Sequence, residues 1–169
     1  TQGTADAIVG DFNSDGAPDL LAFDGTTERF YENEAPGGTL AFTERTGAAN
    51  PFDGIGQAFQ TSANTLVTDI TGNGFVDVAF RTPSGAQTDW MLVENVDGST
   101  YVQQTGTDNP LRNVAADAST QSLAAATGDF NFDGTRDLLT VDAGTQRFYT
   151  RDATGTFAEQ TGSASPFDQ

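Results

Sequence analysis

The hydrophobic residues of this chain fall in short runs that Gly, Asp and Asn interrupt. In Phe30–Glu32 and Phe148–Thr150, apolar and polar side chains alternate with a period of two, as in a strand with one buried face. No stretch shows the period of about 3.6 residues that marks an amphipathic helix. The pattern therefore predicts short β-strands that are joined by turns.

The same pattern occurs three times. An acidic loop begins at residues 11, 69 and 129, so the repeats are 58 and 60 residues apart. A strand-like run precedes each loop, a second follows it directly, and two more complete the unit. The units span approximately residues 1–52, 53–111 and 112–169 of a single module. Repeated four-stranded units are typical of β-propeller blades, so we expect an all-β fold of three four-stranded antiparallel units.

The composition of the chain argues against several classes of function. The net charge of −17 argues against binding to nucleic acid or to anionic membranes, because both need basic residues. Such acidity suits solubility, cation binding or both. The chain has no Cys and no His, which excludes a Cys/His zinc site, a Cys nucleophile and a Ser-His-Asp triad. No apolar run approaches the roughly 20 residues that span a bilayer, so we expect no membrane insertion.

The acidic loops have the spacing of a calcium site. Oxygen-bearing side chains stand at loop positions 1, 3, 5 and 9, and Gly at position 6 allows a tight curl around one point. Three converging carboxylates would repel each other without a cation. An EF-hand is excluded because position 12 is Ala22 or Thr140 instead of Glu, and a strand follows the loop. The alternative is an Asp/Asn/Gly turn without metal.

The second loop is a weaker candidate for calcium binding, because Thr71 and Asn73 occupy positions 3 and 5 and leave two carboxylates. Sodium, water or weakly held calcium are all compatible with it.

The loops and their flanking strands resemble the FG-GAP/VCBS repeats of integrin-α-like β-propellers. The stretch TGAANPFDGI (46–55) is similar to the joints of long bacterial VCBS-type proteins. The resemblance covers essentially the whole chain and implies two to three Ca²⁺ per chain and an extracellular or cell-surface location. It implies side-chain ligands at Asp11, Asn13, Asp15, Asp19, Asp69, Thr71, Asn73, Asp77, Asp129, Asn131, Asp133 and Asp137, and backbone oxygens at Ala17, Phe75 and Thr135.

The resemblance also implies a binding module, because some members of the family are lectins that hold sugars between blades. Carbohydrate binding or cell-surface adhesion is therefore expected, with Trp90, Tyr31, Tyr101 and Tyr149 as candidate stacking platforms or else packing residues. The alternative is a structural or assembly module of a larger secreted or surface protein. We expect no enzyme, because no nucleophile or base stands outside the repeats.

Three blades leave an open arc, whereas propellers close with four to eight blades. The chain starts just before a strand and stops after a third unit, so whole blades are expected to be the unit. We therefore expect a homodimer that forms a six-bladed ring. The alternative is a fragment of a longer propeller.

Overall fold

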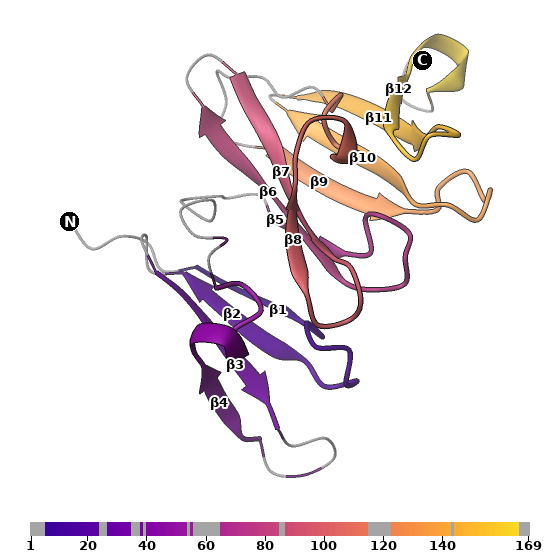
Figure 1. The fold of residues 1–169 in the computed structure, drawn as a ribbon. Coiled ribbons are helices and arrows are strands. Elements are labelled where there is room, and N and C mark those ends of the chain that lie inside the picture. Colours follow the sequence, from indigo (N-terminus) through magenta and orange to yellow (C-terminus); the bar gives the residue numbers. More distant parts are fainter. Residues whose placement is uncertain are drawn as a thin grey trace.

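The computed structural model describes residues 6–23, 27–34, 38, 40–53, 55, 65–84, 87–114, 123–142 and 144–165. This part of the chain contains three four-stranded antiparallel sheets and no α-helix (Figure 1). The predicted all-β fold of three four-stranded units is confirmed. None of the helical turns in the described ranges is long enough to cross a membrane.

Each sheet contains four consecutive strands in the order of the sequence. The first sheet consists of β1 (Asp6–Gly10), β2 (Asp19–Phe23), β3 (Glu28–Asn33) and β4 (Phe42–Arg45). The second consists of β5 (Thr65–Thr68), β6 (Asp77–Ser84), β7 (Gln87–Asn95) and β8 (Tyr101–Gln104). The third consists of β9 (Leu123–Gly128), β10 (Asp137–Asp142), β11 (Thr145–Arg151) and β12 (Phe157–Gln160). A short 3-10 turn follows each sheet, at Gly47–Ala49, Gly106–Asp108 and Gly162–Ala164.

The register places equivalent residues of the three units on equivalent faces. Val9 lies opposite Leu20, which lies opposite Tyr31, so these side chains share one face of the first sheet. The same row is Val67, Val78 and Val93 in the second sheet, and Thr127, Leu138 and Tyr149 in the third. We call the face that carries this row the leading face, and the opposite one the trailing face.

The hydrophobic core lies between the sheets and not within any one of them. One buried cluster joins the trailing face of the first sheet to the leading face of the second, with Phe12 and Phe52 packed against Tyr101. The ring centroids of Phe12 and Phe52 are 5.5 Å apart, and those of Phe52 and Tyr101 are 4.3 Å apart. Burial of these rings is the main force that holds the two sheets together.

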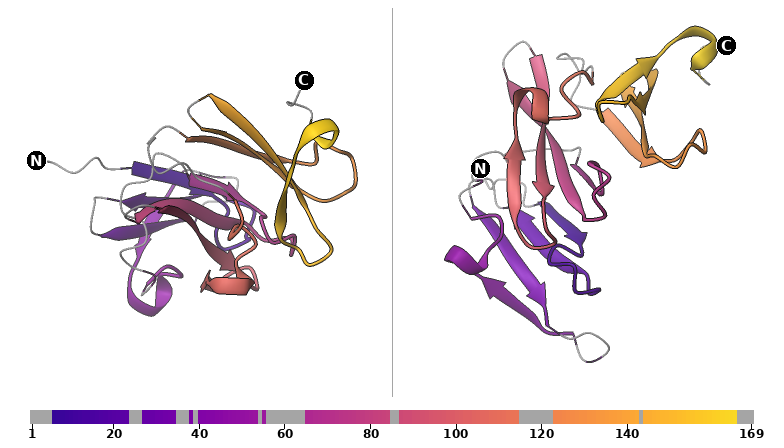
Figure 2. Two further views of the ribbon diagram at one scale, coloured as in Figure 1. Left: turned by 90° about the horizontal axis from the view of Figure 1, so that it is seen from above. Right: turned by 45° about the vertical axis from the view of Figure 1, so that its right-hand side comes forward.

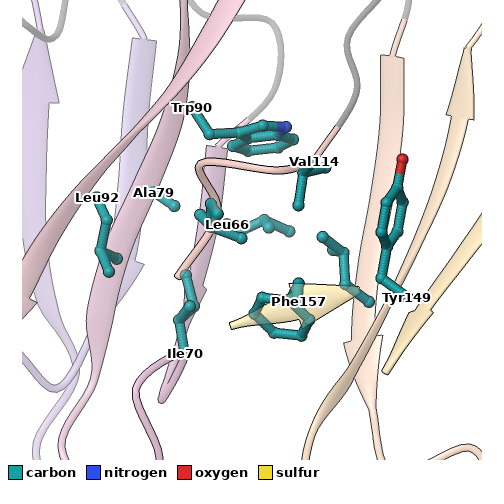
Figure 3. Packing of buried hydrophobic residues seen from close by; sticks show 10 residues of the cluster. Leu66, Ile70, Ala79, Trp90, Leu92, Val114, Tyr149 and Phe157 are labelled. Carbon is teal, nitrogen blue, oxygen red and sulfur yellow. The ribbon is translucent and has the colours of Figure 1, made fainter. Parts of the chain in front are cut away.

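A second cluster joins the second and third sheets in the same way. Leu66 and Ile70 from the trailing face of the second sheet face Tyr149 and Phe157 from the leading face of the third (Figure 3). The three sheets therefore form a row in which the second lies between the other two (Figures 1 and 2). The first strands, β1, β5 and β9, adjoin along this row. The described residues do not close into a ring.

Candidate metal centre

The three acidic loops occupy the same place in each unit, between the first and second strands of the sheet. All three lie on the right-hand side of the row in Figure 1. Position 6 of each loop is a glycine with positive φ, for example 88° at Gly16. Position 4 is also left-handed in each loop, with φ of 61° at both Ser14 and Phe132 and 80° at Gly72. The sharp curl that the glycine spacing predicts is therefore present in every unit.

The aspartate at position 1 shapes the curl by accepting backbone hydrogen bonds. Both carboxylate oxygens of Asp11 accept amide protons, from Asp15 at 3.0 Å and from Gly16 at 3.0 Å. Asp129 accepts the amide protons of Asp133 and Gly134 at the same distances. Asp69 does so in the second loop, from Gly72, Asn73 and Gly74.

Positions 3 and 5 point their polar groups at each other in the first and third loops. The Asn13 amide donates to Asp15 Oδ2 at 2.9 Å, and the Asn131 amide donates to Asp133 Oδ2 at 2.8 Å. The residue at position 7 donates its amide proton to position 5, from Ala17 to Asp15 and from Thr135 to Asp133. The hydroxyl and amide of Thr135 lower the pKa of Asp133, because hydrogen bonds to the carboxylate favour its charged form.

The aspartate at position 9 is the most buried acidic group of each loop. Asp19, Asp77 and Asp137 are fully buried where their sheets begin the second strand. Asp19 accepts the amide protons of Phe12 at 3.0 Å and Asn33 at 2.9 Å, and thereby ties the loop to β3. Burial raises the pKa of all three carboxyls, because desolvation penalises the charged form more than the hydrogen bonds favour it.

The third loop differs from the other two in the hydrogen bonding of one carboxylate oxygen. In the second sheet Asp77 Oδ1 accepts the Asn95 amide proton at 2.9 Å, just as Asp19 Oδ1 accepts that of Asn33. The equivalent oxygen of the third loop, Asp137 Oδ1, is buried and has no hydrogen-bond partner among the residues that the structure describes. A buried carboxylate oxygen without a donor is costly unless a cation or water compensates it.

The donor set of the first and third loops fits a hard cation. It consists of oxygen atoms alone, and each carboxylate oxygen that accepts one amide proton keeps a further lone pair. In the described ranges, however, no three acidic side chains come close enough together to form a metal site as they stand. Asp15 and Asp133 are exposed, whereas the aspartates at position 9 are buried.

A positively charged side chain lies beside the second loop. Arg151 of the third sheet reaches across and donates from Nη1 to the carbonyl oxygen of Thr71 at 2.7 Å. Its guanidinium lies over the Phe157 ring, 5.6 Å from the ring centroid, and the charges of Asp69 and Asp77 stabilise it. Burial nevertheless lowers the pKa of Arg151 from its ordinary value. The amide of Asn73 is turned away from the loop centre toward Glu94 and the Asn95 carbonyl.

Sequence reasoning did not find Arg151. The signal was present, because Arg151 stands where the other two units have Asn33 and Asn95, at the end of the third strand. An arginine in place of two asparagines, one unit after the loop that lacks a carboxylate, is the kind of substitution that compensates a charge.

Most of the aromatic candidates are packing residues. Trp90, Tyr101 and Tyr149 are buried between sheets, whereas Tyr31 is half-buried on the leading face of the first sheet. The Tyr101 hydroxyl lies 3.1 Å from the Phe12 carbonyl and 3.0 Å from the Val76 carbonyl. The packing role that the sequence left open for these rings is thus the one that burial supports.

A polar groove of about 240 Å³ lies between the second and third sheets beside the second loop. Two guanidinium groups line it, those of Arg112 and Arg151, together with Glu94 and Asp108 and several hydroxyl groups. No aromatic ring of the described residues lines it, so this groove was not foreseen from the candidate stacking residues.

No family model matches the chain, and no curated protein sequence is similar to it.

Proposed function

We propose that this chain is a calcium-binding β-propeller module in which each four-stranded sheet is one blade. The observation that carries the proposal is the buried Asp137 Oδ1, an oxygen without a partner at the end of a loop with two further aspartates. The equivalent loop of the first sheet has the same donor types at the same spacing. The resemblance to FG-GAP/VCBS repeats supports the same interpretation.

The first and third loops are the proposed calcium sites. Asp11, Asn13, Asp15 and Asp19, with the backbone of Ala17, would hold one ion. Asp129, Asn131, Asp133 and Asp137, with the backbone of Thr135, would hold the other. A bound calcium ion would supply positive charge that offsets the repulsion between these carboxylates. The chain's own part is to hold the buried aspartate fixed and to bring the exposed one inward.

The second loop is proposed to use Arg151 in place of a tightly bound ion. Its two carboxylates, Asp69 and Asp77, already stabilise that guanidinium. A second cation a few ångströms away would be repelled by it. We therefore propose two calcium ions per chain rather than three.

Calcium titration of metal-free protein tests this proposal. Binding to the native state alone raises stability by about 2.7 kcal/mol at a hundredfold excess over Kd. For a domain of this size that corresponds to a rise in Tm of roughly 5–10 °C. Isothermal titration should give two sites per chain. A Tm that calcium does not change, on protein shown to be metal-free, would contradict the proposal.

The role of the module is proposed to be binding at a cell surface, either adhesion or carbohydrate recognition. The groove between the second and third sheets offers charged and hydroxyl groups of the kind that hydrogen-bond to sugars. A glycan array with calcium present tests this, with Arg112→Ala as the variant that should lose binding. Retained binding in that variant would place the ligand elsewhere.

The burial of Trp90, Tyr101 and Tyr149 favours a second candidate, a structural module without a small ligand. Three of the four candidate stacking rings are then needed for packing between sheets. An array without any bound glycan, together with a calcium-dependent fold, would support this second role.

A further inference from the structure

The two contacts between sheets use the same positions of the repeat. In each contact, the leading face of one sheet supplies the first residue of its fourth strand, which is the inserted residue. The trailing face of the preceding sheet supplies the second residue of its acidic loop, which is the receiver. At the first junction these residues are Tyr101 and Phe12, whose ring centroids are 6.4 Å apart. At the second they are Phe157 and Ile70, which belong to one buried cluster (Figure 3). All four are almost fully buried.

The leading face of the first sheet carries the inserted residue without a receiver. Phe42, the counterpart of Tyr101 and Phe157, is 47% exposed. Val9 is 62% exposed, whereas its counterpart Val67 packs against the first cluster. Leu20 is half-buried, although its counterparts are completely buried. An apolar row that is covered in two sheets is thus uncovered in the first.

The trailing face of the third sheet carries the receiver without an inserted residue. Phe130, the counterpart of Phe12 and Ile70, is 48% exposed. Phe132 is 91% exposed at loop position 4, where the first loop has Ser14 and the second Gly72. Position 4 also faces the next sheet: an added Cβ at Gly72 would meet Arg151 Nη1 at 2.7 Å. Two phenylalanines therefore point to the side on which another sheet would pack.

We infer that a second copy of this chain covers both faces, with the third sheet of each copy packed on the first sheet of the other. The exposed faces are the two missing halves of a contact that the chain makes twice internally, and they lie at opposite ends of the row (Figure 1). Phe42 of one copy would insert beside Phe130 of the other, as Tyr101 inserts beside Phe12. Two such contacts, related by a two-fold axis, close a ring of six sheets, which is within the range of known propellers.

A separate monomer would leave large apolar groups exposed at both ends of the row, which is unfavourable. The ring of two copies is preferred because it buries both faces. The inference is argued from side-chain contacts between sheets and not from calcium binding, although the receiving residues lie inside the acidic loops.

Light scattering of the chain as it stands tests the ring. A mass about twice that of the 17.7 kDa chain is expected, and it should not grow with protein concentration. A monomer at the highest concentration that stays clear would overturn the inference. A series of growing polymers would overturn the closed ring, because the head-to-tail contact would then fail to close.

Paired variants test the contact itself. Phe42→Arg and Phe130→Glu should each be monomeric, because each variant places a charge against an apolar partner at both junctions of its ring. An equal mixture should recover the dimer, since one junction is then the original pair and the other joins opposite charges. Both residues are exposed, so folding should persist, which circular dichroism checks.

Val96→Glu is the matched control. Val96 is 42% exposed and directly follows β7 of the middle sheet, just as Glu34 follows β3 of the first. Its substitution should leave the dimer intact. Dimeric Phe42→Arg and Phe130→Glu variants, or a mixture that stays monomeric, would show that these faces do not pair.

Discussion

The aspartates at positions 9 and 5 of the loops have separable roles. Asp77 accepts the amide protons of Ile70 and Thr71 at 2.8 Å and that of Asn95 at 2.9 Å, all of them local to its own sheet. All three bonds join atoms of the protein itself. Asp15 is exposed, and its carboxylate accepts the Asn13 side-chain amide and the Ala17 backbone amide of its own loop. The buried aspartate therefore belongs to the fold first, and the exposed one can be lost from the fold at little cost.

Two alanine variants should separate these roles. In EDTA, Asp77→Ala should lower the free energy of unfolding by about 3 kcal/mol or more, because the buried amides of Ile70 and Asn95 and the part-buried amide of Thr71 lose their acceptor. Asp15→Ala should cost less than about 1 kcal/mol in EDTA but should lose the calcium effect of the first loop. Urea unfolding with and without calcium measures both. Equal losses in EDTA would contradict the division of roles.

Substitution of loop position 5 should remove calcium from the first and third loops but not from the second. Asp133→Ala and Asp15→Ala should each remove one calcium ion, whereas Asn73→Ala should leave the number of bound ions unchanged, because Arg151 already serves the second loop. Isothermal titration counts the ions. Loss of an ion in the Asn73 variant would show that the second loop binds calcium beside the arginine.

Spacing in the sequence located these residues because the curl is local. Glycine at position 6 and acceptors at positions 1 and 9 determine the loop within nine residues, and no distant contact is needed. The contact of Arg151 with the Thr71 carbonyl joins residues 80 positions apart, and it depends on how the sheets stack. The repeat alignment marks Arg151 as different from Asn33 and Asn95, but no local pattern shows that it reaches the second loop. The same holds for the hydrogen bonding of the buried Asp137 oxygen.

At the scale of the strand, identical repeat positions have different surroundings. Gly10 and Gly128 both end the first strand of their sheet. A Cβ added at Gly10 would meet Val67 Cγ1 of the second sheet at 2.9 Å, so the two sheets approach closely there. At Gly128 an added Cβ would meet only the Phe130 ring of its own loop, at 3.1 Å, and that ring is half-exposed.

Alanine at these two glycines should therefore have unequal effects. Gly10→Ala should destabilise by about 1–3 kcal/mol, since overpacking a closed contact forces neighbouring side chains to shift. In the monomeric Phe42→Arg background, Gly128→Ala should cost less than Gly10→Ala, because the Phe130 ring then has room to move. Chemical denaturation of both variants in this background measures the difference. A loss at Gly128 as large as that at Gly10 would contradict it.

The strands themselves were predictable from the alternation and from the loop phase, since each unit repeats both. Which apolar rows would be buried was not. Val9 and Val67 occupy equivalent strand positions, and only the order of the sheets leaves one exposed and buries part of the other. Burial between sheets is a property of the assembled row, so repeat sequences of similar composition do not reveal it.

At the scale of the molecule, the dominant feature is charge. The chain carries 24 acidic and seven basic residues and a net charge of −17, all within 169 residues. Charge of one sign opposes the compact state through self-repulsion. Many of the charged groups in the described ranges are exposed, and dissolved ions screen such groups over about 10 Å at 0.1 M salt. The fold should therefore respond to ionic strength as a whole, apart from any specific site.

Monovalent salt should stabilise the calcium-free protein. In EDTA, Tm should rise between low salt and about 0.5 M NaCl as screening weakens the repulsion. With calcium bound, two ions offset four of the 17 excess negative charges, so the same salt series should produce a smaller rise. Potassium chloride is the control, because screening depends on ionic strength and not on the cation. Equal slopes with and without calcium would mean that calcium does not relieve the repulsion, and a flat Tm in EDTA would mean that the repulsion is not limiting stability.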